Sequence, residues 1–275
     1  MNWRGIRAII RKDLMVVTRS RNTMLAMIVV PLLFTVALPA GMILLSSSQD
    51  MLDEFSPDGD MALFFNNLPA SINDELSAFP QPNQQIIILL TMYLFAPMFL
   101  ILPMMTSSIL AADSFAGEKD RKTLEALIYT PLTDAEIFIA KLLSSFVPAL
   151  LVSLLGGLAY GLVVNTVAAP IMGRIFFPNL TWVALIFWVA PAAAALGLGA
   201  VVLVSSRVNS AQEANQLSGL IVVPLVLLVI GQLGGVVYLS AGVVFSIGFV
   251  FWLLGAALLW YGARTFKRGE LLARL

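Results

Sequence analysis

Charged residues near the middle of the chain have the spacing of a short, self-stabilised helix. Residues 113–141 read DSFAGEKDRKTLEALIYTPLTDAEIFIAK. Glu118 and Lys122 lie four residues apart, as do Arg121 and Glu125. Opposite charges at this spacing attract on one helix face, each pair contributing roughly 0.3 kcal/mol. Such pairs support a helix and do not by themselves form a reaction centre.

The same predicted helix has an apolar face. Leu124, Leu127 and Ile128 gather on one side of it. A plain solvated loop needs neither this face nor two ion pairs. The pattern is typical of a short rigid helix that fits a groove on a partner protein.

The residues after this predicted helix have the signals of a helix end and of a second helix start. Thr130 precedes Pro131, and the residue before a proline disfavours helix, so the first helix is expected to end there. Thr133 and Glu136 then have the spacing of a capping box. We expect a second helix to begin at this point.

The composition excludes several kinds of chemistry. The chain has no Cys and no His, which removes thiolate chemistry, His-dependent triads and the commonest metal ligand. Neither GxxxxGK[ST], which binds ATP phosphates, nor GxSxG, which carries a serine nucleophile, is present. We expect no enzyme activity, cofactor or metal in this chain, so any ATP and Mg would belong to a partner subunit.

The whole chain has the composition of an integral membrane protein. Of its 275 residues, 59% are hydrophobic and 12% charged, against about 25% charged in soluble domains. Its apolar runs reach the roughly 20 residues that cross a bilayer as helix, and they lack the alternation of barrel strands. We predict one all-α membrane domain, residues 1–275, with six spans at 24–46, 86–112, 141–164, 182–205, 217–239 and 241–262. A short re-entrant piece between the last two spans is left open.

Lys and Arg orient these spans, because basic residues collect on the cytoplasmic side. With the N-terminus inside, 15 of the 16 basic residues fall in inner segments and Arg174 alone lies outside. Both termini are therefore expected in the cytoplasm. Residues 47–85 form an acidic outer loop, which either gathers cations or is simply solvated.

The interiors of the spans carry no charged residue except Lys141. It lies at a span boundary, where we expect it to extend toward the membrane interface. Ion-coupled carriers usually keep an ionisable residue at membrane depth, so this composition disfavours them. A pathway of hydroxyls and amides favours amphipathic, lipid-like or hydrophobic cargo.

Glycine and proline in the spans predict close packing and bends. Gly197 and Gly199 are expected to pack helices together. Prolines such as Pro97 and Pro191 remove a backbone hydrogen bond that neighbouring helices must replace. A gating hinge and an ordinary membrane-helix proline are both open readings.

The first 20 residues predict an amphipathic helix on the membrane surface. Its basic side chains would face anionic headgroups. The apolar stripe opposite them consists of Trp3, Ile6, Ile10, Leu14 and Val17. Asp13 falls within this stripe, which a lipid-surface helix would avoid. We expect Asp13 to pair with a basic group or to cap another element.

At these positions the sequence resembles the membrane subunit of type-2 ABC exporters, a family that includes sodium-efflux, multidrug and lipid-exporter permeases. The resemblance covers nearly the whole chain and does not identify the cargo. The matching segments are FAGEKDRKTLE at 115–125, Thr130-Pro131, Lys141, RKD at 11–13, SSRVNSAQEAN at 205–215 and the basic tail at 264–272.

The resemblance implies an exporter permease that uses ATP hydrolysed by a separate cytoplasmic ATPase. It implies two permease copies, as a homodimer or a paralogous heterodimer, bound to two ATPase subunits. The permease copies would lie in a prokaryotic cytoplasmic membrane. Membrane lipid would be a further partner, and no nucleic acid is expected to bind. Residues 1–22 would be a connecting helix and 113–140 a cytoplasmic coupling segment. The residues implied to contact the ATPase are Glu118, Arg121, Lys122, Leu124, Glu125, Leu127, Ile128, Thr130 and Pro131. Spans two and five would line the cargo path, with Thr91, Tyr93, Met98, Met104, Met105, Gln216 and Gln232 as candidate side chains.

Two other functions are compatible with the sequence. One is a secondary carrier or channel that needs no ATPase. Transport driven by an ion gradient in the absence of ATP would support this function. The other is a membrane scaffold that transports nothing and is regulated by an ATPase. Nucleotide-dependent flux in a reconstituted complex separates this scaffold from a permease.

Overall fold

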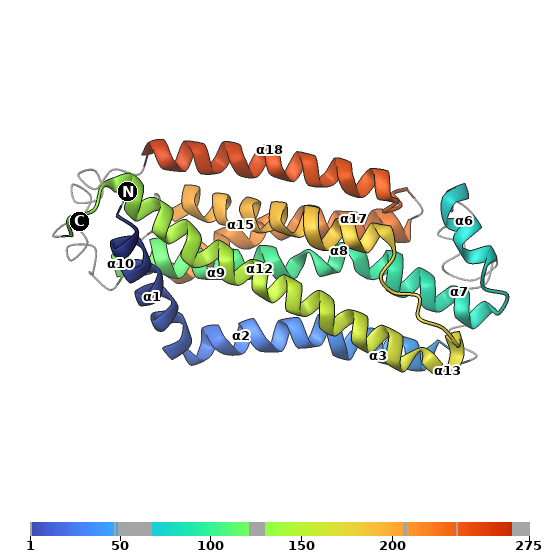
Figure 1. The fold of residues 1–275 in the computed structure, drawn as a ribbon. Helices are drawn as coiled ribbons and strands as arrows, with labels where there is room; N and C mark the ends of the chain where they lie inside the picture. The colour runs from blue at the N-terminus through green and yellow to red at the C-terminus, as the bar shows by residue number, and fades with distance from the viewer. Residues whose placement is uncertain are drawn as a thin grey trace.

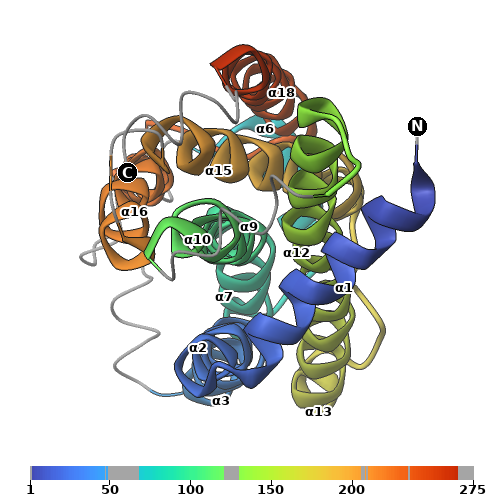
Figure 2. The same cartoon turned by 90° about the vertical axis from the view of Figure 1, so that its left-hand side faces the viewer.

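The computed structural model of the chain describes residues 2–46, 48, 68–120, 130–205, 208, 210–234 and 236–265. Within these residues the protein is helical and contains no strand. Long helices run side by side as a bundle, and α1 (Trp3–Arg19) lies across one end of it (Figures 1 and 2). The all-α membrane fold expected from the sequence is therefore confirmed for the described part of the chain.

Five helical runs are long and apolar enough to cross a membrane. They are Thr23–Leu45, Pro82–Phe115, Asp134–Val167, Leu180–Ser205 and Ala241–Arg264. In place of the expected fifth span, the chain forms α16 (Ala211–Ser218), the 3-10 turn η4 (Gly219–Val222) and α17 (Val223–Leu233). The 11 residues of α17 are fewer than the roughly 20 that a straight crossing needs. Five spans are supported, and the sixth stays a prediction.

Three of the spans contain a π-helical turn just ahead of a proline. Proline has no N–H, so it cannot donate to the carbonyls four and five residues upstream. Those carbonyls fall within the π turn before Pro39, Pro97 and Pro191 alike. The segments are α2 (Arg21–Leu32), η1 (Leu33–Ala37) and α3 (Leu38–Leu45); α7 (Pro82–Ile88), η2 (Leu89–Leu94), α8 (Phe95–Phe99) and α9 (Ile101–Phe115); and α14 (Leu180–Ala184), η3 (Leu185–Val189) and α15 (Ala190–Ser205). The bends expected from proline are thus built as widened helical turns.

The second span is the central helix of the bundle. Of its most apolar window, 83% is buried inside the chain, against 17% for the first span. Gly197 of α15 lets the two helices approach closely, because a Cβ there would meet the Met104 carbonyl oxygen at 2.7 Å. A Cβ on Gly199 would meet the Leu258 side chain at 2.8 Å. The packing role expected of both glycines is confirmed.

The last helix, α18 (Ala241–Thr265), packs along η3 and α15 by glycines at every seventh residue. These are Gly248, Gly255 and Gly262, and their neighbours in the same order are Trp188, Leu196 and Val202. A Cβ on each glycine would lie 2.4–3.1 Å from the neighbour. The glycines are seven residues apart and their neighbours eight and six residues apart, and both rows increase together, so the two helices run parallel.

The opposite end of the bundle is covered by the short helix α6 (Ala70–Ser77) (Figure 1). Ile72 and Leu76 of α6 are buried in the main core. Its Glu75 accepts a hydrogen bond from the Tyr93 hydroxyl. The long helix α12 (Asp134–Val167) and the following α13 (Ala169–Met172) reach the same end.

Candidate functional site

The N-terminal helix α1 is attached to the start of α12 by an apolar cluster. Ile6 and Ile9 are buried against Leu132, Ile137 and Ala140. The amphipathic helix expected from the sequence is confirmed, although its buried stripe is rotated from the predicted one. Ile9 is buried and Ile10 only partly so, while Trp3 is 54% exposed. The rotation follows from packing, since α1 buries Ile6 and Ile9 on α12.

A capping box joins the same two helices at their ends. The Thr133 hydroxyl accepts from the Glu136 N–H, and the Glu136 carboxylate accepts from the Thr133 N–H at 3.0 Å. This confirms the predicted start of the helix. The second oxygen of Glu136 accepts from the backbone N–H of Asn2 at 2.6 Å. One carboxylate therefore caps α12 and holds the beginning of α1.

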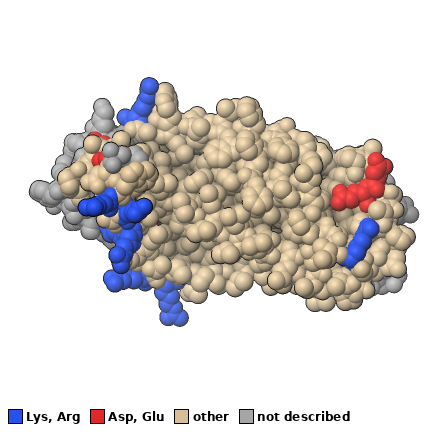
Figure 3. Space-filling view, viewed as in Figure 1, with Lys and Arg blue, Asp and Glu red and all other residues tan. Residues whose placement is uncertain are grey.

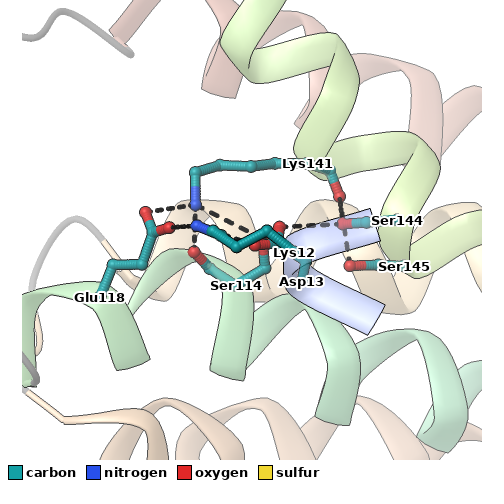
Figure 4. A network of polar contacts seen from close by, with 7 residues as sticks. All are labelled: Lys12, Asp13, Ser114, Glu118, Lys141, Ser144 and Ser145. Carbon is teal, nitrogen blue, oxygen red and sulfur yellow. Dashed lines mark hydrogen bonds and ion pairs between the residues drawn. The ribbon is translucent and has the colours of Figure 1, made fainter. Parts of the chain in front are cut away.

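Asp13 lies on the buried side of α1 and accepts hydrogen bonds from two other helices (Figure 4). Its Oδ2 is 2.7 Å from the Ser114 hydroxyl of α9 and 3.2 Å from the Ser144 hydroxyl of α12. Its Oδ1 pairs with Lys12 at 3.0 Å. The prediction that Asp13 pairs with a basic group is confirmed.

Lys141 is placed differently from the prediction. It lies two turns inside α12, is 1% exposed, and does not reach solvent. Its ammonium pairs with Glu118 at 2.5 Å and donates to the Ser114 carbonyl oxygen. The prediction of an interfacial lysine was wrong, because α9 and α10 (Gly117–Asp120) supply a carboxylate and a carbonyl that the sequence alone does not place beside it.

Glu118 connects the two lysines. One carboxylate oxygen contacts Lys12 on α1 and the other contacts Lys141 on α12. Glu118 is 3% exposed, so it is buried within the chain and offers little surface to another protein. The expected i, i+4 partner, Lys122, lies outside the described residues. A direct contact between Glu118 and the ATPase stays a prediction.

Two carboxylates and two ammonium groups thus form a network with balanced charge, which we call the ionic network: Lys12, Asp13, Glu118 and Lys141. Lys12 is its most exposed member, with 44% of its side chain exposed. Burial alone would lower the pKa of Lys12, but attraction to Glu118 and Asp13 outweighs burial and raises that pKa. Lys12 therefore remains charged at neutral pH.

A cavity of about 520 Å³ opens between α1 and the network. Gly5, Ala8 and Ile9 of α1 form one wall, and Thr130 and Pro131 lie on the other side. Of the residues predicted to contact the ATPase, Glu118, Thr130 and Pro131 belong to the part of the chain that the structure describes. The remaining members lie outside the described residues: Arg121, Lys122, Leu124, Glu125, Leu127 and Ile128.

The candidate cargo-path residues divide into two groups. Thr91, Tyr93 and Gln232 come together at η2, where Gln232 Nε2 donates to the Tyr93 carbonyl at 3.0 Å and Thr91 donates to its own helix. All three are buried inside the chain. Their use in a cargo path stays a prediction.

The other path candidates lie along the rest of the second span or far from it. Met104 is 1% exposed, whereas Met98 and Met105 are partly buried. Gln216 is exposed on α16. The structure does not bring Gln216 to Gln232, because α16 and α17 occupy opposite ends of one helical run.

Sequence reasoning missed the serines of the network. Ser114 and Ser144 read as ordinary membrane-helix hydroxyls, and neither has a motif. Their signal is positional: Ser144 follows Lys141 by three residues on one helix face, and Ser114 precedes Glu118 by four. Only the packing of α1 against both helices reveals what they bind.

The fold and this site define the class as a multi-pass α-helical membrane protein whose amphipathic N-terminal helix is tied to its transmembrane bundle. A family model described as "ABC-2 family transporter protein" matches residues 7–268. The chain belongs to this family of ABC-transporter membrane proteins, which serve as the permease component and work with an ATP-binding subunit. No protein in the curated set matches the chain.

Proposed function

We propose that this chain is the permease subunit of an ATP-driven exporter, which moves an amphipathic or lipid-like substrate out of the cell with ATP hydrolysed by a separate ATPase. The family match supports the permease role. The sequence holds no GxxxxGK[ST] motif, which supports a separate source of ATP hydrolysis. The complex would contain two permease copies and two ATPase subunits in a prokaryotic cytoplasmic membrane.

The observation that carries this proposal is the anchoring of both ends of the coupling segment. In its first part, Glu118 contacts Lys12 of α1 and Lys141 of α12. In its later part, Leu132 is buried with Ile6 and Ile137. A segment held at both ends by the transmembrane bundle can pass a displacement to that bundle, because packed helices move as rigid elements.

Binding to the ATPase tests the proposal directly. We expect the tagged permease to co-purify with the cognate ATPase subunit from detergent-solubilised membranes. Leu124→Asp with Leu127→Asp should abolish this binding, because two charges would occupy the apolar face predicted to enter the ATPase groove. Ile175→Asp is the matched control: it also replaces an apolar side chain by a carboxylate, but at a residue that is 82% exposed between α13 and α14.

Two results would contradict the proposal. One is a full-strength complex in the double variant. The other is transport in ATP-free liposomes driven by an ion gradient, which would instead support a secondary carrier. A complex that binds and hydrolyses ATP but produces no nucleotide-dependent flux would point to a regulated scaffold.

A further inference from the structure

The ionic network joins three parts of the chain that are far apart in sequence. Lys12 and Asp13 come from α1, Ser114 and Glu118 from α9 and α10, and Lys141 from α12 (Figure 4). The partners are separated by 101, 106 and 23 residues. No single helix can move away from the other two without breaking a charged contact.

Burial makes such a separation costly. The side chains of Asp13, Glu118 and Lys141 are 7%, 4% and 1% exposed. An ion withdrawn from its partner inside a protein or membrane keeps the penalty of leaving water and loses the attraction that offsets it. The network therefore favours arrangements in which the three helices stay together.

Apolar packing already holds these helices, so the charges add a specific register. Phe115 of α9 packs edge-on against Phe138 of α12 at 5.9 Å, and Ile6 of α1 packs on α12. A buried charge is stable only while its partner stays in contact, so the ion pairs disfavour any register that separates them. Glu118 makes such pairs in two directions, one from each oxygen.

We propose that Glu118 and Lys141 are positioning residues that make α1, α10 and α12 move as one body when the ATPase displaces the coupling segment. Glu118 lies within that segment, so its carboxylate carries the displacement to α12 through Lys141 and to α1 through Lys12. Lys141 lies two turns inside a transmembrane helix, where the displacement enters the membrane. This inference rests on the proposed function and assigns a route to it.

The decisive variant removes the link without leaving an unpaired ion. In Glu118→Gln with Lys141→Met, both charges of one pair disappear and side chains of similar volume remain. Lys12 and Asp13 still pair with each other at 3.0 Å. We expect this double variant to fold, to bind the ATPase and to hydrolyse ATP.

The readout is the ATP-driven movement at the far end of the bundle, which needs no known cargo. The chain has no Cys, so Ile175→Cys with Val236→Cys places two spin labels in loops that are 82% and 80% exposed. The label distance is measured in the ATPase complex in liposomes, without nucleotide and after trapping with ATP and vanadate. We expect a shift in the otherwise unchanged chain and the loss of most of that shift in the double variant.

A second variant keeps the inference testable if the double variant does not fold. Lys12→Gln removes the most exposed member of the network and cuts the link from Glu118 to α1. It should bind the ATPase and give a reduced shift. Arg11→Gln, an exposed neighbour that loses the same charge, is the control and should keep the full shift.

The outcomes separate the two levels of the proposal. A full ATP-driven shift in a folded double variant, or in Lys12→Gln, overturns the positioning role alone. If the chain that carries only the two label sites neither binds the ATPase nor shows a shift, that result counts against the proposed function itself. A reduced shift with intact binding and hydrolysis supports the positioning role, since a purely structural role would lower stability and leave the shift of the folded protein unchanged.

Discussion

Ser114 and Ser145 are both buried serines near the ionic network, and they differ in what they bind. The Ser114 hydroxyl donates to the Asp13 carboxylate on another helix at 2.7 Å. The Ser145 hydroxyl donates to the Lys141 carbonyl of its own helix at 3.2 Å. Hydrogen bonds to charged groups contribute about 1.5–3 kcal/mol, against about 1 kcal/mol for neutral pairs.

We therefore expect Ser114→Ala to lower the free energy of unfolding by about 2 kcal/mol and Ser145→Ala by about 1 kcal/mol or less. The measurement is thermal unfolding of the purified protein in a single detergent, with the remaining monodisperse protein quantified at each temperature. Equal losses in the two variants would show that Asp13 is not held by Ser114 in the folded protein.

At the level of single residues, the sequence predicts a property more readily than a partner. Asp13 stood out because a carboxylate broke an apolar stripe, and its need for a partner followed from the cost of burying a charge. Lys141 gave the opposite impression, because a lysine near a helix end normally reaches water. Its true environment depends on the approach of α10, which no local pattern encodes.

At the level of elements, the π turn η2 is held by side chains from other helices. Pro97 has no N–H to offer the carbonyls of Met92 and Tyr93. These carbonyls accept instead from Trp182 Nε1 at 2.9 Å and from Gln232 Nε2 at 3.0 Å. Neighbouring helices thus replace the backbone donor that proline lacks.

This replacement predicts an interaction between two distant substitutions. Gln232→Leu should cost about 1 kcal/mol, because the Tyr93 carbonyl loses its side-chain donor. In a Pro97→Ala background the backbone supplies an N–H at residue 97, so the same substitution should cost clearly less. A double-mutant cycle of thermal stability measures this difference. Strict additivity of the two substitutions would contradict the compensation.

The same elements show which parts of the fold the sequence can specify. Five of the six predicted spans and the Thr133 cap follow from apolar length and local hydrogen bonding, and the structure has them. The π turns were not predicted, because a proline signals only that a hydrogen bond is missing and not how the helix widens. In the described part of the apolar run at 217–239, the α-helix α17 is short, since the 3-10 turn η4 comes directly before it.

At the level of the whole molecule, charge is segregated between the two ends of the bundle. On the face shown in Figure 3, basic side chains gather at the α1 end, and acidic side chains lie at the other end, where a basic side chain is also visible. Arg174 belongs to that second end, where it lies over the Phe79 ring at 4.0 Å and donates to the Ala78 carbonyl. Because basic residues remain on the cytoplasmic side, the α1 end is predicted to face the cytoplasm.

Single cysteines can test this orientation without a background signal, because the chain has none. Arg7→Cys places a thiol on the exposed side of α1, and Ile175→Cys places one in the loop beside Arg174. A membrane-impermeant maleimide added to intact cells should label Ile175→Cys at once and Arg7→Cys only after permeabilisation. The unsubstituted chain should stay unlabelled in both conditions. Labelling of Arg7→Cys in intact cells would place α1 and the ionic network outside, where a cytoplasmic ATPase has no access to them.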